Sequence, residues 1–253
     1  MKKKLFPILL SVLFASVSGT TVAQSKLFNK ETFTNKDGET LNYRLLISDY
    51  DQSSTYPLVI FLHGSGERGD DNEAQLKWGV KNFATPEVMK NYRPVVIAPQ
   101  CPSGESWANL SQSDLSLRSE PTKPMKLLME LIDEIVANYA IDKDRIYITG
   151  LSMGGYGTYD LIMRRPELFA AAVPVCGAGD PGKAALISSI PIWIFHGAKD
   201  DVVDPKHSKD MYSALVKAGA KPGLTIYPEA GHFSWIPAYN DPMLMPWLFD
   251  KKK

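Results

Sequence analysis

The chain of 253 residues has only two cysteines, and it carries no excess of charge of either sign. Two cysteines exclude a scaffold in which several disulfides staple a small core. With 28 basic and 28 acidic residues, the chain lacks the basic surplus that attracts nucleic acid or an anionic membrane surface. Beyond residue 23 it also lacks an apolar run long enough to span a bilayer. We therefore expect neither a nucleic-acid partner nor stable membrane association.

The first 23 residues have the three-part pattern of a secretory signal peptide. The lysines at positions 2–4 precede an apolar stretch from Leu5 to Val17, and small residues ending in Thr21-Val22-Ala23 follow. This pattern predicts cleavage after Ala23 and a secreted or periplasmic protein. Residues 24–253 are then long enough for one well-buried catalytic domain.

The remaining sequence alternates between strand-like and helix-like patterns. Helical spacing of apolar residues predicts helices over Met125–Tyr139 and Pro205–Ala218. Alternation of this kind from the third strand onward favours an α/β fold with a mostly parallel sheet and helices on both faces. The eight predicted strands lie near 27–34, 39–48, 57–62, 93–99, 145–149, 170–175, 191–195 and 223–228.

The motif Gly150-Leu151-Ser152-Met153-Gly154 lies between the predicted strand 145–149 and a helix-like segment that begins near Tyr156. A G-x-S-x-G sequence in this context is typical of a nucleophile elbow, in which a sharp turn exposes a serine hydroxyl and small neighbours relieve crowding. The motif therefore predicts Ser152 as a nucleophile.

A serine nucleophile needs a general base, and the chain has four histidines. On an elbow fold the acid and the histidine follow the serine in chain order. His63 precedes Ser152, and His207 falls inside a predicted helix. His196 ends the seventh predicted strand, and the loop after that strand should supply the acid rather than the base. These exclusions leave His232, which follows a glycine turn, as the predicted base.

Three aspartates follow the seventh predicted strand and could orient the histidine. Asp200 lies where the loop first leaves the strand, whereas Asp201 would point the other way in an extended chain. Asp204 precedes Pro205 and is placed to cap the next helix. We predict Asp200 as the acid, with Asp204 as the alternative.

An oxyanion hole requires two backbone N–H groups aimed at the developing negative charge. On an elbow fold one belongs to the residue after the nucleophile, here Met153, and the other to the loop after the third strand. That loop contains Gly64-Ser65-Gly66. We predict Ser65 as the second donor, with Gly66 as the alternative.

With these motifs in place, the chain resembles the α/β-hydrolase superfamily over nearly all of residues 24–253. The matching segments are Leu62–Gly69, Gly150–Gly155, His196–Asp200 and Glu229–His232. Within the superfamily the chain is similar to lidless bacterial carboxylesterases of the phospholipase/carboxylesterase and "predicted peptidase" type, near feruloyl and acetylxylan esterases. The resemblance implies an eight-stranded, mostly parallel sheet and a triad acid at Asp200.

Two segments of this expected fold bear on its cleft. Only Cys176–Ile190 lies between the sixth and seventh predicted strands, which is too short for a cap domain. The irregular stretch Cys101–Thr122 should form one wall of the cleft. Within it, Trp107 could stack on a substrate ring or anchor the packing of its own loop.

The two cysteines each follow a predicted strand. In the expected fold two other strands separate those strands, at about 4.8 Å per spacing. That separation exceeds the Cα distance of about 7 Å that a disulfide tolerates. We therefore expect Cys101 and Cys176 to be free thiols.

Together these features predict a serine carboxylesterase that hydrolyses short-chain or aromatic acyl esters, including feruloyl or acetyl esters of plant polysaccharides. The alternatives are a serine peptidase of the prolyl-oligopeptidase type and an inactive binding protein on the same fold. The predicted partner is a small-molecule or oligosaccharide-linked ester. No cofactor or metal is expected, because the histidines are too scattered for a ligand set.

Overall fold

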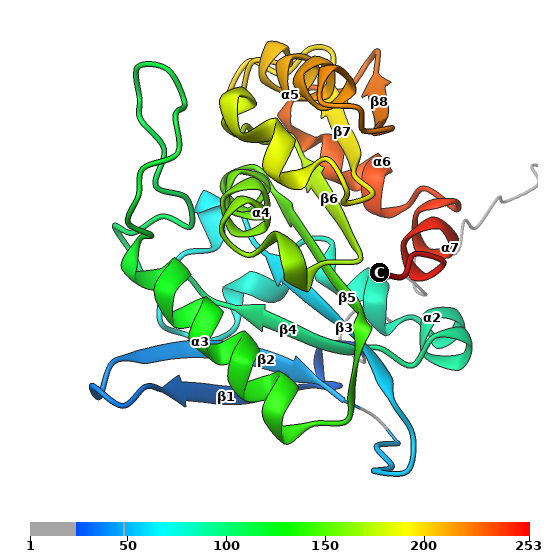
Figure 1. The fold of residues 1–253 in the computed structure, drawn as a ribbon. Coiled ribbons are helices and arrows are strands. Elements are labelled where there is room, and N and C mark those ends of the chain that lie inside the picture. The colour runs from blue at the N-terminus through cyan, green and yellow to red at the C-terminus, as the bar shows by residue number, and fades with distance from the viewer. Residues whose placement is uncertain (1–23, 48) are drawn as a thin grey trace, which may run out of the picture.

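The computed structural model describes residues 24–47 and 49–253, which form an eight-stranded sheet covered on both faces by helices (Figure 1). The predicted signal peptide lies outside the described residues. All eight predicted strands are present, and the mostly parallel α/β fold is confirmed. The strands are β1 (Phe28–Thr34), β2 (Thr40–Leu46), β3 (Tyr56–Leu62), β4 (Val95–Pro99), β5 (Ile141–Leu151), β6 (Ala171–Val175), β7 (Trp193–Gly197) and β8 (Gly223–Tyr227).

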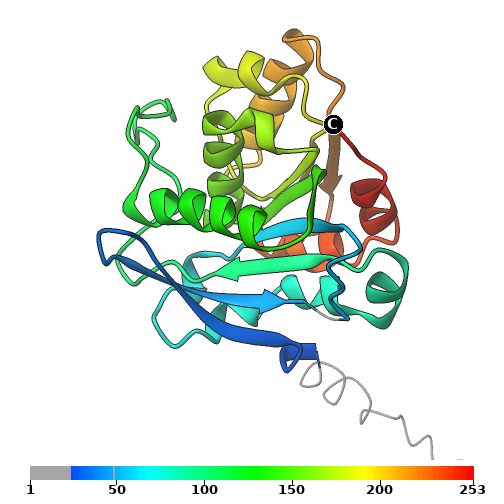
Figure 2. The same cartoon turned by 60° about the horizontal axis from the view of Figure 1, so that its bottom comes forward.

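The strand order is β1-β2-β4-β3-β5-β6-β7-β8. The first two strands pair antiparallel with each other, β2 pairs antiparallel with β4, and every later pairing is parallel. Figure 2 shows β1, β2 and β4 side by side, with β1 at the outer edge. Because β3 to β8 run in one direction, their carboxyl ends meet at one edge of the sheet, where ligands bind in open α/β sheets.

The helices divide between the two faces. The three longest helices, over Lys123–Asn138, Met153–Arg164 and Lys206–Lys217, lie where the sequence or the elbow motif predicts them. The apolar stripe of the first contributes Leu128, Leu131 and Ile135 to one core. The opposite core includes Phe83, Tyr239 and Phe249. The helices are α2 (Pro86–Asn91), α3 (Lys123–Asn138), α4 (Met153–Arg164), α5 (Lys206–Lys217), α6 (Trp235–Tyr239) and α7 (Leu244–Phe249).

Two connections shape the cleft. Between β6 and β7 the chain forms only the short 3₁₀ helix η5 (Pro181–Ile187), so this connection holds no cap domain. The segment from Cys101 to Thr122 projects from the body as a long excursion before α3 (Figure 1). Its Asn109 N–H donates to the buried Asp160 carboxylate at 2.9 Å, and Arg164 donates to the carbonyl of Ser119 at 2.7 Å. These bonds tie the excursion to α4.

The strand order also separates the two cysteines. β3 and β5 lie between β4, which precedes Cys101, and β6, which precedes Cys176. Both thiols are buried and unpaired, as expected from the sequence. Among residues 24–47 and 49–253, no helix combines the length and the apolar character that crossing a membrane requires.

Candidate active site

Ser152 occupies a strained turn between β5 and α4. Its backbone has φ 51° and ψ −118°, a conformation that is rare for a residue with a side chain. The flanking glycines make this turn possible, since a Cβ on Gly150 would lie 2.3 Å from the Gly154 carbonyl oxygen. A Cβ on Gly154 would lie 1.9 Å from the carbonyl oxygen of Leu62. The predicted nucleophile elbow is therefore present.

His232 follows β8 and opens the 3₁₀ helix η6 (His232–Ser234). Its Nε2 lies 2.9 Å from the Ser152 Oγ, and its Nδ1 lies 2.8 Å from Oδ2 of Asp200. With Nδ1–H donating to the carboxylate, Nε2 is free to accept the serine proton. The structure thus brings Ser152, Asp200 and His232 into one hydrogen-bonded chain.

Asp200 lies in the loop after β7, and its side chain is inaccessible to solvent. The N–H groups of Val202 and Val203 donate to its Oδ1 at 3.0 and 2.9 Å. Burial acts to raise the pKa of the Asp200 carboxyl, but the bonds from Val203, His232 and Val202 outweigh it and lower that pKa. The carboxylate therefore stays ionised beside the imidazole.

The other two aspartates of this loop lie elsewhere. Asp204 accepts the N–H of Lys206, the first residue of α5, at 2.8 Å, although Pro205 rather than Asp204 occupies the N-cap position that the sequence predicted for Asp204. Asp201 is exposed. Of the three, only Asp200 contacts His232 among the interactions of the described residues.

His196 also contacts this site, although its place in the sequence did not predict such a role. Its Nε2 lies 3.1 Å from Oδ2 of Asp200 and 2.9 Å from the Val203 carbonyl oxygen, while Nδ1 lies 2.7 Å from the Ser208 hydroxyl. Burial lowers the pKa of His196, so a neutral ring donates from Nε2 and accepts from Ser208. Asp200 is thus held from both sides, and the position of His196 at the end of β7 was the available signal.

The predicted oxyanion loop follows β3 as the 3₁₀ helix η1 (Ser65–Glu67). Met153 is the first residue of α4, where backbone N–H groups have no carbonyl partner within the helix. Ser65 and Gly66 are both exposed. The choice of Ser65 over Gly66 as the second donor stays a prediction.

Two buried side chains, His63 and Glu67, connect this loop to the protein interior. His63 Nδ1 donates to the Gly64 carbonyl oxygen at 2.6 Å, and its Nε2 accepts the N–H of Cys101 at 2.9 Å. Burial lowers the pKa of His63 to about 4, which keeps the ring neutral and able to accept. Burial raises the pKa of the Glu67 carboxyl, while Lys77, the Gly64 backbone and the Trp78 side chain act to lower it. The loop is thereby connected to the segments around Cys101 and Trp78.

The stacking role considered for Trp107 is wrong. The Trp107 side chain is 0% exposed, its indole N–H donates to the His63 carbonyl oxygen at 3.2 Å, and its ring packs edge-on against the His63 ring. A Cβ on Gly157 would lie 2.5 Å from the Trp107 Cβ, so the residue is wedged against α4. Trp107 anchors its own loop, which was the alternative reading of the sequence.

A polar cleft of about 570 Å³ opens beside Ser152. Its floor includes Ser152 and Tyr156, and its outer wall is the excursion that follows Cys101. Hydrogen-bonding side chains on that wall include Glu105, Ser106 and Asn109. The cleft therefore offers hydrogen-bonding groups to the part of a ligand that binds in it.

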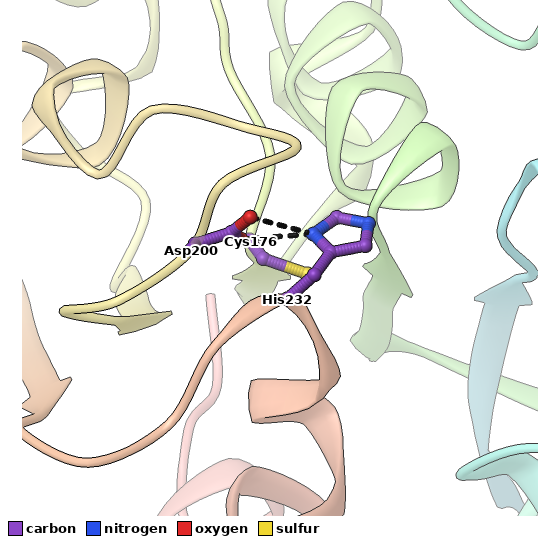
Figure 3. Close-up of side chains that lie close together, drawn as sticks. All are labelled: Cys176, Asp200 and His232. Atoms are coloured by element: carbon purple, nitrogen blue, oxygen red, sulfur yellow. Dashed lines mark hydrogen bonds and ion pairs between the residues drawn. The ribbon is translucent and has the colours of Figure 1, made fainter.

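Cys176 lies close to the acid and the base (Figure 3). One ligand atom from each of Cys176, Asp200 and His232 falls within 4.8 Å of the others, so the three could be considered as metal ligands. The scattered histidines did not predict this cluster, because it combines one histidine with an aspartate and a cysteine. Burial raises the pKa of the Cys176 thiol to about 12, and backbone N–H groups already occupy Oδ1 of Asp200. These features fit a hydrogen-bonded triad better than a metal centre.

Comparison with known proteins agrees with this architecture. A solved structure described as a thermostable esterase superposes with a TM-score of 0.86 at 39% identity, covering 91% of this chain and 64% of that one. A ferulic acid esterase superposes at 0.68 with 16% identity, covering 88% of this chain and 98% of that one, which supports the fold alone.

Among curated proteins, a bifunctional acetylxylan esterase/xylanase from Neocallimastix patriciarum is 28% identical over 193 residues. The match covers 72% of this chain but only 26% of that larger protein. A probable carboxylesterase from Oryza sativa subsp. japonica is 27% identical, with 70% of this chain and 81% of the relative covered. The esterase character that the sequence predicts is shared by these relatives.

The family model for Phospholipase/Carboxylesterase matches residues 48–240, which is most of the chain. The match includes the elbow serine, the aspartate after β7 and the histidine after β8. The chain is a hydrolase of the α/β-hydrolase fold and belongs to the phospholipase/carboxylesterase family.

Proposed function

We propose that the chain is a serine carboxylesterase in which Ser152, His232 and Asp200 perform acyl transfer to water. The observation that carries this proposal is the continuous chain of hydrogen bonds from the Ser152 hydroxyl through the imidazole to the Asp200 carboxylate. Its order and spacing match the arrangement that activates a serine for nucleophilic attack.

In this mechanism the Ser152 Oγ bonds to the ester carbonyl carbon while His232 Nε2 takes the hydroxyl proton. The carbonyl oxygen becomes an oxyanion, which accepts hydrogen bonds from the N–H groups of Met153 and Ser65. His232 then protonates the departing alkoxide as the C–O bond to the alcohol breaks. Water repeats the cycle on the acyl-enzyme and releases the acid, and Asp200 holds the ring through both halves.

We infer that the substrates are short-chain or aromatic acyl esters of a polar alcohol, including acetyl or feruloyl esters of plant polysaccharides. The open polar cleft beside Ser152 supports this inference, because hydroxyl-rich groups can hydrogen-bond to Ser106 and Asn109. The acetylxylan esterase relative supports it at the level of the family. Export by the predicted signal peptide would place the enzyme where such fragments arrive.

The test is labelling by a fluorophosphonate probe together with turnover of p-nitrophenyl esters. Ser152→Ala should abolish labelling and lower kcat by about 10⁶, because the triad residues act as a unit. Ser213→Ala is the matched control, since Ser213 is exposed on α5 and its hydroxyl donates to the Lys209 carbonyl, remote from the triad. Absence of labelling in the unmodified protein would favour an inactive binding protein.

Substrate class is tested by an acyl-chain series, acetylated xylan oligomers and peptide p-nitroanilides. We expect kcat/KM to fall steeply from butyryl to palmitoyl esters, and acetate or ferulate to be released from xylan oligomers. Preference for palmitoyl esters would refute the short-acyl proposal. Faster cleavage of the anilides than of any ester would instead support the serine peptidase.

A further inference from the structure

Three aromatic side chains gather beside His232: Phe233 is exposed, Trp78 is partly buried and Trp235 is buried. Phe233 follows the histidine directly, and its ring centroid lies 4.7 Å from that of Trp235 and 6.1 Å from that of Trp78. Trp78 and Trp235 are 6.2 Å apart. We call Trp78, Phe233 and Trp235 the aromatic rim. Its members come from the segment before η3 (Val80–Ala84), from η6 and from the start of α6, so only the fold brings Trp78 to the other two.

The outer part of the aromatic rim is exposed, whereas Trp235 is only 6% exposed and packs into the core. Phe233 is 57% exposed and the nearby Ile236 is 45% exposed. A groove of about 510 Å³ runs alongside, lined by Trp78, Trp235 and Ile236. Contiguous apolar surface of this kind, unlike a single exposed leucine, is typical of a binding site.

The aromatic rim is connected to both elements that surround a reacting carbonyl. The Trp235 ring packs edge-on against the His232 ring at 5.2 Å, and His232 Nε2 lies 2.9 Å from the Ser152 Oγ. On the other side, burial raises the pKa of Glu67 in the oxyanion loop, and the nearby Trp78 side chain acts to lower it. A ring bound here would therefore lie on the His232 side of an ester held at Ser152.

The aromatic rim and the polar cleft differ in chemistry. The cleft wall carries Glu105, Ser106 and Asn109, which suit a hydroxyl-bearing alcohol. The aromatic rim offers ring faces and edges, which suit a flat apolar group. An ester with an aromatic acyl half and a polar alcohol half would match both.

We propose that the aromatic rim is the binding site for the aromatic ring of the acyl group, while the polar cleft receives the alcohol. This inference rests on the proposed esterase function and assigns its acyl specificity to Phe233 and Trp78. Ring stacking of this type is worth a several-fold gain in binding. Trp107, which is buried, plays no part in it.

The test compares Phe233→Leu, which keeps apolar volume but removes the ring, with the unmodified enzyme. We expect the ratio of kcat/KM for methyl ferulate to that for methyl butyrate to fall about fivefold, mainly through KM. Trp78→Leu should lower the same ratio. Leu186→Ala removes a remote side chain that is 50% exposed, and it should leave the ratio as it was.

Four results would overturn the inference. An equal fall in kcat/KM for methyl ferulate and methyl butyrate would show that Phe233 acts only by positioning His232. A selective loss on phenyl acetate relative to ethyl acetate would assign the aromatic rim to the alcohol half. Turnover of methyl butyrate without any turnover of methyl ferulate would reject the aromatic acyl group while leaving the esterase proposal intact. Failure of the unmodified enzyme to turn over any ester would instead reject the proposed function, and this inference with it.

Discussion

The substitution Asp200→Asn tests the proposed acid most directly. In the structure Oδ1 accepts the N–H groups of Val202 and Val203, and Oδ2 faces His232 Nδ1 at 2.8 Å and His196 Nε2 at 3.1 Å. An asparagine has one acceptor oxygen, which the two backbone donors retain. Its NH₂ group then meets the Nδ1–H of His232, donor against donor.

His232 can relieve that clash only by moving its proton to Nε2. In this tautomer Nε2 no longer accepts the hydroxyl proton of Ser152, so nucleophilic attack loses its general base. The expected fall in kcat is about 10⁴. At about 1.4 kcal/mol per factor of ten, this corresponds to roughly 5.5 kcal/mol of lost transition-state stabilisation.

Asp204→Asn is the matched control in the same loop. Its side chain accepts the Lys206 N–H at the start of α5, and an asparagine caps a helix about as well as an aspartate. We expect kcat to stay within about twofold of the unmodified value. The measurement is kcat on p-nitrophenyl butyrate for both variants, with melting curves to show that each is folded.

The reasoning would be refuted if Asp200→Asn kept more than a tenth of the unmodified kcat. It would also fail if Asp204→Asn were the more damaging of the two, because that ranking would move the acid to Asp204. Folding of Asp200→Asn is a separate question, since an unsatisfied buried donor costs about 1–3 kcal/mol of unfolding free energy. If Asp200→Asn melts below the assay temperature, kcat is therefore measured for both variants at a lower temperature at which both are folded.

Four further outcomes are expected. His232→Ala should lower kcat on p-nitrophenyl butyrate by about 10⁶, and retention of a tenth of activity would contradict its role as base. EDTA should leave that activity unchanged, because a loss restored by a divalent ion would point to a metal centre. Burial lowers the pKa of His63 to about 4 in the folded protein, whereas the unfolded chain takes up a proton below about pH 6.5. The free energy of unfolding should therefore fall by roughly 3 kcal/mol in total as pH drops from 6.5 to 4, and denaturant titrations that give a constant value would contradict this. Glu105→Gln should raise kcat/KM at low salt more for an anionic ester than for a neutral one, because Glu105 lines the cleft beside Ser152 and its negative charge repels an anion. Equal changes in kcat/KM for the two esters would show that the charge of Glu105 does not affect substrate binding.

Much of the fold could be read from the chain because its signals are local. Strands buried on both faces of a parallel sheet appear as short apolar runs, as in Tyr56–Leu62 and Ala171–Val175, whose residues are all buried. The apolar stripe that predicts α3 is also a local signal, because it depends only on the spacing of residues within the helix. The ends of strands are less well predicted, because pairing with a neighbouring strand can extend them. β5 begins at Ile141 rather than near 145, because it pairs with β3 across a register shift.

The candidate site was predictable to the extent that chain order constrains it. Once Gly150–Gly154 marks an elbow, the base must come late in the chain and the acid before it. These restrictions were enough to single out His232 and favour Asp200. They could not resolve Ser65 from Gly66, since adjacent amides in one loop differ only in the direction of their N–H bonds.

The sequence by itself determined the order of strands and helices, the elbow at Ser152 and the candidates for base and acid, because these depend on neighbours along the chain. Only the tertiary structure decided that Trp107 is buried against His63, that His196 supports Asp200, and that Cys176 lies beside the acid and the base. It alone brought Trp78 to Phe233. Contacts of this second kind join loops at the carboxyl edge of the sheet, and which loops meet there depends on strand order and side-chain packing rather than on any local pattern.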